Sequence, residues 1–352
     1  MQLLIYGATG YTGRLLAARA QALGVPTILA GRNRARLEAL ARAQGMPLRA
    51  FGLDAPRDID AALSGVGVVI NSAGPFGATA RPIAEACLRT GAHYLDVGGE
   101  LPIFQSLQSL DAAAREAGIM IMPGVGFVVA ATDCLAAHAA ASAPDGHSLR
   151  IGVSRATLVS RGSYASMLGL FSETVTVRRN GRLTSVPVGR LEHAFDYGEG
   201  DSVSAAVVWP DVFTAWYSTK IPNIEAYVEA GPLTRWTYAL AARVAEPLRY
   251  KPIQDVVALQ TRVWPEGPSE RQRDRAERTI VVEVEDRYRR GKRARLHTPD
   301  GYSLTPLSAL KIAERVLAGD SPAGFQTPAT AYGPDLILGL PGVRREDATR
   351  FP

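Results

Sequence analysis

The sequence has few cysteines and no long hydrophobic run. Its 352 residues include only two cysteines, Cys87 and Cys134. Two cysteines cannot form a framework of disulfides, so we expect a cytoplasmic protein. The longest apolar stretch, residues 118–131, is interrupted by Pro123 and two glycines and is too short to cross a bilayer. The N-terminus shows no basic segment and no small-residue cleavage site, so we expect no secretion signal.

Metal-ligand patterns and strongly basic segments are also missing. The five histidines are scattered, and none pairs at metal-ligand spacing, so we expect no metal site. The formal net charge is only +5. Much of the basic character lies in residues 271–295, where acidic residues are interleaved. A run of mixed sign is typical of a solvated face, so we expect no nucleic-acid partner.

An alternating pattern of apolar runs fills the first 140 residues. The length and a hydrophobic content of 47% allow two domains with sizeable cores. Apolar runs predict strands at 3–6, 27–30, 48–51, 66–70, 93–97 and 119–122, and helical spacing predicts helices at 11–23, 35–43, 59–63, 83–89 and 107–117. Strands that alternate with helices form βαβ units, so we predict an α/β, Rossmann-type, doubly wound parallel sheet.

The pattern changes after residue 144. Stretches such as 174–177 and 203–209 alternate in polarity, and 279–286 predicts a half-exposed strand. Residues 287–292 could form its turn and 294–297 the return strand. We therefore predict a second, α+β domain with a mixed or antiparallel sheet. A helix is predicted at 306–317, followed by a tail rich in glycine and proline.

The first predicted strand runs into three regularly spaced glycines. In a βα turn, the first glycine allows a tight turn and the second lets the backbone approach a pyrophosphate at the helix N-terminus. The third lets the helix pack closely on the strand. The spacing Gly-x-x-Gly-x-x-Gly differs from the commoner Gly-x-Gly-x-x-Gly, and the alternative is a purely structural turn. The predicted pyrophosphate-binding residues are Gly7, Thr9, Gly10, Tyr11, Thr12 and Gly13.

The end of the second strand carries arginine where NAD-specific enzymes usually carry a carboxylate. Here the strand is followed by Gly31, Arg32 and Asn33. An arginine can pair with the 2′-phosphate of NADP and stack on the adenine, so Arg32 and Asn33 are predicted NADP-binding residues. The alternative is that the arginines only solubilise the start of a helix.

Further glycine-bearing loops follow the later strands. Ligands of open α/β sheets bind beyond the carboxyl ends of strands, so these loops should outline one cleft. The loop 124–126 belongs to the same group. The predicted contacts to the nicotinamide side of the cofactor are Asn71, Ala73, Gly74, Pro75, Val97 and Gly98.

These motifs together resemble a known family. Residues 6–13 (YGATGYTG), 30–33 (AGRN), 71–76 (NSAGPF), 93–100 (HYLDVGGE) and 123–127 (PGVGF) resemble, in this order, the saccharopine dehydrogenase-like oxidoreductases. The similarity is closest to the branch with bacterial trans-acting enoyl reductases. It covers residues 1–140 well and continues more loosely to residue 342.

The resemblance implies a domain organisation. We expect an NADP-binding Rossmann domain at 1–145, a substrate and dimerisation domain at 146–304, and a segment at 305–352 that returns to the first domain. A homodimer is expected. The resemblance implies little about the substrate, because substrates differ within the family.

Candidates for catalysis are few. A reductase needs a proton donor beside the cofactor and its acceptor. We name Tyr217, Lys220 and Arg161 as candidate catalytic residues, and consider Tyr94 and Tyr164 as further proton donors. Lys220 stands where the family resemblance leads us to expect glycine. The segment 203–216 carries Trp209, Phe213 and Trp216 and is either domain core or the lining of an apolar pocket.

Three functions are compatible with these motifs. The first is NADPH-dependent reduction of an activated C=C bond in an apolar, enoyl-type substrate such as a lipid or polyketide-like intermediate. The second is a saccharopine-type interconversion of an imine and a secondary amine of amino acids, which should require several arginines in the cleft; Arg155 and Arg161 are the candidates. The third is a non-catalytic NADP-binding protein.

Overall fold

The computed structural model describes residues 1–154, 159–162, 174–231 and 264–351. The predicted roles of Arg155 and Tyr164 lie outside these residues. Contacts between Cα atoms divide the chain into two compact units. The first unit contains Met1–Ala130 and Gly301–Tyr332, and the second contains Ala131–Asp300 and Gly333–Pro352.

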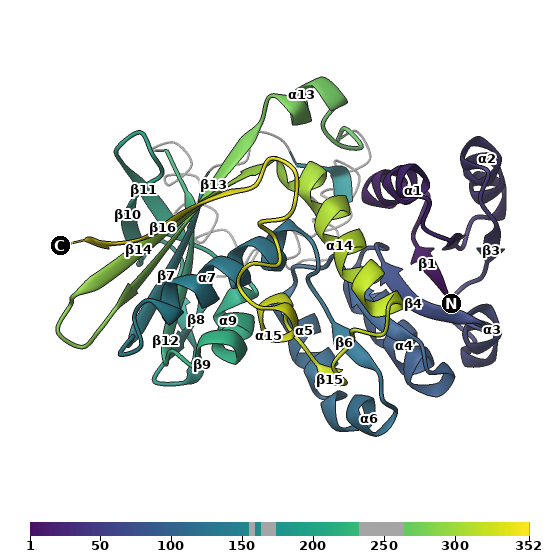
Figure 1. The fold of residues 1–352 in the computed structure, drawn as a ribbon, viewed down its shortest axis with the longest axis horizontal. Helices are drawn as coiled ribbons and strands as arrows, with labels where there is room; N and C mark the ends of the chain where they lie inside the picture. The colour runs from purple at the N-terminus through teal and green to yellow at the C-terminus, as the bar shows by residue number, and fades with distance from the viewer. Residues whose placement is uncertain (155–158, 163–173, 232–263, 352) are drawn as a thin grey trace, which may run out of the picture. The chain divides into compact units, whose positions relative to one another are not determined.

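The first unit contains a parallel sheet of seven strands (Figure 1). The strand order is β15-β6-β5-β4-β1-β2-β3. From β1 the chain adds β2 and β3 on one side of the sheet and then β4, β5, β6 and β15 on the other side, so the sheet is doubly wound. The predicted fold class is confirmed. The strands are β1 (Gln2–Tyr6), β2 (Thr27–Gly31), β3 (Leu48–Ala50), β4 (Val66–Asn71), β5 (His93–Asp96), β6 (Met120–Met122) and β15 (Gly324–Phe325).

Helices connect these strands, as the apolar spacing predicts. Every residue of β4 is buried, because helices pack on both faces of a parallel sheet. Helix α1 ends at Gly24, whose left-handed conformation lets its N–H bond the last carbonyls of the helix. The helices of this unit are α1 (Tyr11–Leu23), α2 (Arg34–Gln44), α3 (Pro56–Ala62), α4 (Phe76–Thr90), α5 (Leu101–Gln108), α6 (Asp111–Glu116), α14 (Gly301–Leu317) and α15 (Pro328–Tyr332).

The second unit contains a mixed sheet of nine strands. Its order is β10-β11-β12-β7-β13-β14-β16, and β8 pairs with β12 and β9. Only β7 and β12 run parallel; the other pairs are antiparallel. The strands are β7 (Ser148–Val153), β8 (Thr174–Arg179), β9 (Arg182–Pro187), β10 (Glu192–Asp196), β11 (Asp201–Ala206), β12 (Asn223–Glu229), β13 (Glu277–Glu285), β14 (Gly291–Pro299) and β16 (Arg344–Phe351).

Helical segments complete the second unit. A π-helical turn, Phe127–Ala131, spans the boundary between the units and leads into helix α7 (Thr132–Ala141) of the second unit. Helix α7 packs on α9 (Asp211–Thr219) and on strands β13 and β14. A short helix, α13 (Glu270–Asp274), precedes β13. No helix among the described residues is long and apolar enough to cross a membrane.

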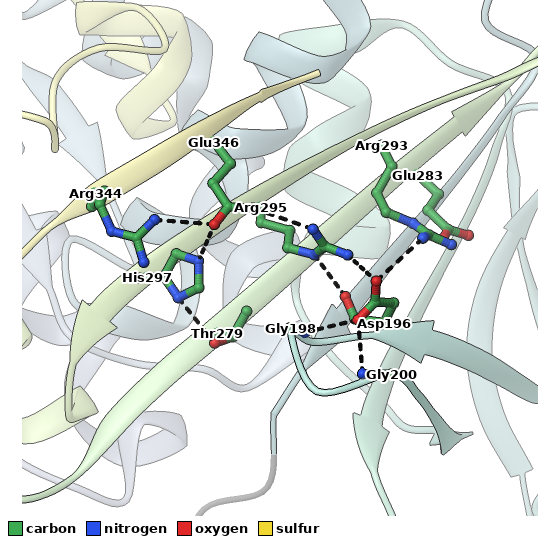
Figure 2. A network of polar contacts seen from close by, with 10 residues as sticks. All are labelled: Asp196, Gly198, Gly200, Thr279, Glu283, Arg293, Arg295, His297, Arg344 and Glu346. Atoms are coloured by element: carbon green, nitrogen blue, oxygen red, sulfur yellow. Dashed lines mark hydrogen bonds and ion pairs between the residues drawn. The ribbon is translucent and has the colours of Figure 1, made fainter. Parts of the chain in front are cut away.

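The nine-stranded sheet curls so that β10 lies against β13 and β14, although these strands are not neighbours in the strand order. Phe195 of β10 packs where Gly152 of β7 has no side chain; a Cβ there would lie 2.7 Å from the Phe195 ring. Asp196 ion-pairs with Arg295 of β14, and Arg293 binds Glu283 at 2.6 Å (Figure 2). This face therefore carries alternating charges that neutralise one another.

The boundaries of the units differ from those expected at 145/146 and 304/305. The first unit ends at Ala130 and resumes at Gly301, the first residue of α14, which packs on α1 and β4. The tail divides between the units. Gly324 and Phe325 extend the parallel sheet as β15, whereas residues 344–351 form β16, which pairs with β14 in the second unit.

Candidate functional site

The turn between β1 and α1 is shaped by Gly7 and Gly13. Gly7 has a φ of +83°, and a Cβ on it would lie 2.7 Å from the backbone nitrogen of Ala73. A Cβ on Gly13 would overlap the carbonyl oxygen of Gly7, because α1 packs directly on the turn. These two positions therefore require glycine for the fold itself, as the motif predicts for a tight turn and a close helix.

Gly10 differs from these two glycines. A Cβ on Gly10 would have only the carbonyl oxygen of Gly7 near it, at 3.2 Å, and Gly10 is exposed. It is the N-cap of α1, and within the described structure this helix start has neither a side-chain cap nor an acidic residue in its first turn. The positive end of the helix dipole is thus open to an anion. This geometry fits the pyrophosphate of a dinucleotide.

The loop after β2 exposes an arginine. Arg32 is exposed, and we find no ion pair or hydrogen bond from its side chain to the described residues. Asn33 caps helix α2 by accepting a hydrogen bond from the Arg36 N–H at 3.0 Å. Arg34 ion-pairs with Glu38 on the same helix at 3.6 Å. Arg32 is therefore the arginine of this loop that is available to a 2′-phosphate.

The loop after β4 is organised by a buried asparagine. The Asn71 side-chain oxygen accepts a hydrogen bond from the Ala73 N–H at 3.0 Å, and its amide donates to Thr79 at 3.1 Å and to Tyr94 at 3.3 Å. Its side chain is fully buried. Asn71 thus positions the loop 72–75, whose Gly74 and Pro75 are exposed.

A buried tyrosine and aspartate connect this loop to two others. The Tyr94 hydroxyl donates to Asp96 Oδ2 at 2.8 Å, and Asp96 Oδ1 accepts from the N–H groups of Gly98 at 2.9 Å and Gly124 at 3.0 Å. Burial raises the pKa of Asp96 to about 6, although these three donors favour its ionised form. Tyr94 is also fully buried, and burial raises its pKa well above 10. Tyr94 therefore holds loops in place and is not placed to deliver a proton to an exposed substrate.

Sequence reasoning missed the role of Asp96. The signal was present, because Asp96 ends a strand directly before Val97, Gly98 and Gly99. A carboxylate at such a strand end can accept the N–H groups of the glycine loops around it. Only the fold shows that the loop after β6 also bonds to this carboxylate.

Helix α14 supports the loop after β6. The hydroxyl of Ser308 donates to the Val125 carbonyl at 2.7 Å, and the hydroxyl of Thr305 accepts from the Phe127 N–H at 3.1 Å. The same helix contacts the start of α1, where the rings of Tyr302 and Tyr11 meet edge to face at 5.2 Å between centroids. The segment that returns from the end of the chain therefore stabilises the loops at the carboxyl edge of the sheet.

The candidate catalytic residues lie in the second unit. The Nε of Arg161 donates a hydrogen bond to the carbonyl of Trp264 at 2.9 Å, and the backbone N–H of Arg161 donates to the carbonyl of Glu266. The indole of Trp264 in turn donates to the Val159 carbonyl. Arg161 therefore joins two backbone segments of this unit.

Tyr217 and Lys220 lie together at the end of α9. Lys220 Nζ lies 5.5 Å from the centre of the Tyr217 ring, and the Phe213 ring also packs against Tyr217, at 5.3 Å between centroids. Lys220 is exposed and has a φ of +60°, so it occupies the left-handed position at which helices usually carry glycine. The glycine that the resemblance leads us to expect at this position would fit this conformation without strain.

The aromatic segment before Tyr217 has mixed surroundings. Phe213 is buried, and the guanidinium of Arg178 lies 5.0 Å from the centre of the Trp216 ring. Next to this segment, Asp211 and Asp133 are both fully buried, and Asp133 accepts a hydrogen bond from Ser218 at 2.6 Å. Burial raises the pKa of Asp211 well above its usual range, and the neighbouring Asp133 raises it further. Sequence reasoning did not single out Asp211.

In the first unit, the loops after five parallel strands, the glycine turn after β1 among them, lie at the carboxyl edge of a doubly wound sheet, beside the exposed Arg32. This combination is that of a Rossmann-type dinucleotide-binding unit.

Residues 3–122 match the family model of the saccharopine dehydrogenase NADP binding domain. This match confirms the predicted resemblance to saccharopine dehydrogenase-like oxidoreductases over these residues. The matched family model describes an NADP-binding domain, in agreement with the predicted cofactor.

Two curated relatives share this part of the sequence. The chain is 34% identical over 133 residues to a trans-acting enoyl reductase of Mycobacterium leprae, which covers 35% of this chain and 32% of that protein. It is 32% identical over 134 residues to a putative trans-acting enoyl reductase of Mycobacterium tuberculosis, which covers 36% and 32%. The similarity spans about a third of the length of these relatives.

Two solved structures share the whole fold. Saccharopine dehydrogenase (L-Glu forming) of Saccharomyces cerevisiae aligns with a TM-score of 0.66 at 12% identity and covers 99% of both chains. Homospermidine synthase of Legionella pneumophila, solved in complex with NAD, aligns with a TM-score of 0.66 at 10% identity and covers 98% of this chain and 91% of that chain. The likeness extends to the second unit and concerns the fold.

Proposed function

We propose that the protein is an NADPH-dependent reductase of an activated C=C bond in an apolar, enoyl-type substrate. The observation that carries the proposal is the similarity of its nucleotide-binding third to proteins named trans-acting enoyl reductases. The match to the family model of an NADP-binding domain supports the presence of the redox cofactor that such a reaction requires.

The loops of the first unit would hold the cofactor. Gly7, Thr9, Gly10, Tyr11, Thr12 and Gly13 are the proposed contacts to the pyrophosphate, and Arg32 and Asn33 those to the adenosine 2′-phosphate. Ala73, Gly74, Pro75, Val97 and Gly98, which Asn71 and Asp96 hold in place, are the proposed contacts to the nicotinamide side. When bound, NADPH supplies a hydride from its nicotinamide ring.

The chain's part in the chemistry is to orient the acceptor, exclude water and supply a proton. The hydride would add to the carbon β to the carbonyl group, and a proton must then reach the α carbon. Tyr217, with the Lys220 ammonium beside its ring, is the proposed proton source.

The arginines of the second unit favour an apolar substrate over an amino acid with several carboxylates. Arg161, the described candidate for a carboxylate contact, bonds the Trp264 carbonyl. Arg150 and Arg179 line a hollow of about 260 Å³ with Asn223, but both arginines ion-pair with Glu225. Substrate carboxylates would have to displace these internal partners.

The test is an assay of NADPH oxidation. We expect the full chain to oxidise NADPH in the presence of long-chain enoyl thioesters and to leave the saturated thioester as product, identified by mass spectrometry. The saturated thioester as starting substrate is the control and should cause no oxidation. Tyr217→Phe should lower kcat while NADPH affinity stays unchanged.

Two results would contradict the proposal. Oxidation of NADPH with an imine formed from an amino acid and an oxo acid, and not with enoyl thioesters, would assign the saccharopine-type reaction. Binding of NADPH without oxidation by any substrate of either class would support the non-catalytic alternative.

A further inference from the structure

The hairpin between β13 and β14 ends in a tight turn built around one aspartate. Oδ1 of Asp286 accepts the N–H groups of Tyr288 at 2.8 Å and Arg290 at 3.0 Å, and Oδ2 binds Arg290 Nε at 2.7 Å. The Asp286 N–H bonds back to the Arg290 carbonyl at 3.1 Å. These four bonds fix the backbone of residues 286–290, so the side chains of the turn are held in a defined arrangement.

The tyrosine of this turn faces solvent. Tyr288 is 81% exposed, whereas the strands on either side bury Val284 and Ala294. The guanidinium of Arg290 lies 5.3 Å from the centre of the Tyr288 ring. The other exposed large hydrophobic residues of the described structure are Met1, Leu23 and Val203. The hairpin tip therefore presents an aromatic ring that no other described part of the protein covers.

Basic residues surround this ring. Within residues 286–292, the one acidic residue is Asp286, and the basic ones are Arg287, Arg289, Arg290 and Lys292. Arg287 and Arg289 are exposed, and we find no hydrogen bond or ion pair from their side chains to the described residues. The strand register places Arg350 of β16 opposite Lys292, which adds a further positive charge beside the tip.

We propose that this hairpin tip, residues 286–292, is a docking surface for an anionic lipid membrane. The arginines would bind lipid phosphates, and the Tyr288 ring would lie at the level of the headgroups, where amphipathic aromatic rings are favoured. The tip belongs to the second unit, whereas the nucleotide-binding residues belong to the first. The proposal therefore stands whichever substrate the protein reduces.

The shape of the tip favours a membrane over other anionic partners. The hairpin end is convex and projects past the neighbouring strands of its sheet (Figure 1, lower left). A convex tip can dip into a flat layer of headgroups, whereas an acidic protein would need a matching hollow. A nucleic acid would require basic residues along a stripe that follows its backbone. At this hairpin the basic residues surround one projecting ring.

The experiment is flotation of the full chain with lipid vesicles. We expect it to float with vesicles of phosphatidylcholine that contain phosphatidylglycerol, but not with pure phosphatidylcholine, and to be released by high salt. The double variant Arg287→Glu/Arg289→Glu should weaken binding at least about tenfold. Tyr288→Ala should weaken binding and leave its dependence on salt unchanged.

A matched control separates this tip from general surface charge. Arg182→Glu/Arg190→Glu changes the net charge equally at two exposed positions of the same unit and should bind vesicles like the unmodified chain. Equal loss in both double variants would overturn the proposal. So would the absence of binding to anionic vesicles at low salt, or tighter binding of polyglutamate or of a DNA oligonucleotide to the same tip. Thermal unfolding of each variant shows whether it is folded.

Discussion

Asp96 is a fully buried carboxyl group that holds two glycine-bearing loops at the proposed cofactor site. Its ionised form accepts hydrogen bonds from Tyr94, Gly98 and Gly124. Burial outweighs these bonds and raises its pKa from 3.8 to about 6. The folded chain therefore binds a proton at Asp96 more tightly than the unfolded chain does between these pH values.

This shift predicts how stability depends on pH. Because the folded-state pKa lies above the unfolded one, the contribution of Asp96 to the free energy of unfolding should fall by about 2–3 kcal/mol as pH rises from about 4 to 6. Asp96→Asn should remove this decline from the pH profile of the unmodified chain. Urea denaturation across this pH range measures it. Asp60→Asn is the control, because its hydrogen bond to Arg89 lowers the pKa of this partly exposed carboxyl. If Asp96→Asn left the decline as steep as Asp60→Asn does, our account of Asp96 would be wrong.

Lys220 occupies a left-handed backbone conformation that disfavours a side chain. Lys220→Gly should therefore raise the free energy of unfolding by roughly 1 kcal/mol. Asn180→Gly should gain less, because asparagine tolerates its φ of 47° better than lysine does. A loss of stability in Lys220→Gly would mean that the contact of Lys220 Nζ with Tyr217 outweighs the strain. A loss of reductase activity in a more stable variant would support a catalytic role for Lys220.

At the scale of elements, the sequence predicts the first unit well, because apolar runs and helical spacing alternate there without interruption. The predicted helix at 11–23 coincides with α1. The predicted helix at 107–117 is wrong in detail, because α5 ends at Gln108 and a separate helix, α6, begins at Asp111. The predicted helix at 83–89 is too short, because α4 continues through Pro82 back to Phe76.

Two strands at the end of the chain carry no pattern that predicts them. Strand β15 has only two residues, so no alternation can be seen. Strand β16 begins with four charged residues, Arg344, Arg345, Glu346 and Asp347, and this sequence does not predict a strand. It forms because β14 offers it backbone hydrogen bonds and because Glu346 pairs with Arg295 and His297 on β14 (Figure 2). The formation of β16 therefore depends on its pairing with β14 and not on the β propensity of its own residues.

Gly13 and Gly10 are packed differently in the glycine turn, so substitutions at these two positions should affect stability and NADPH binding differently. Gly13→Ala should destabilise the fold by about 2 kcal/mol or more, because its Cβ overlaps the Gly7 carbonyl. Gly10→Val should cost less stability than Gly13→Ala, because its Cβ meets only the Gly7 carbonyl oxygen, at 3.2 Å. It should lose NADPH binding, because its branched side chain would stand at the exposed helix start where the pyrophosphate is proposed to bind. Thermal unfolding with and without NADPH distinguishes the two variants. If NADPH stabilised Gly10→Val as it does the unmodified chain, the pyrophosphate would not bind at this turn.

At the scale of the whole molecule, the sequence predicts two kinds of sheet but not how the chain divides between them. The chain enters the second unit at Ala131, returns to the first at Gly301 and leaves it again after Tyr332. These crossings depend on contacts between residues far apart in sequence, such as Ser308 with Val125. The motifs that predict the cofactor site are local in sequence, so the sequence alone can suggest that site. The roles of Asp96 and α14 could not be predicted in this way, because both depend on such distant contacts.

The central claim is that the first unit binds NADP through the glycine turn and Arg32. Calorimetric titration with NADPH and NADH tests it most directly. We predict tighter binding of NADPH by the unmodified chain. Arg32→Ala should lose roughly 1.5–3 kcal/mol of NADPH binding, with NADH binding unchanged. Arg34→Ala, the neighbouring arginine that pairs with Glu38, should behave like the unmodified chain. Equal affinities of the unmodified chain for NADPH and NADH would contradict the account.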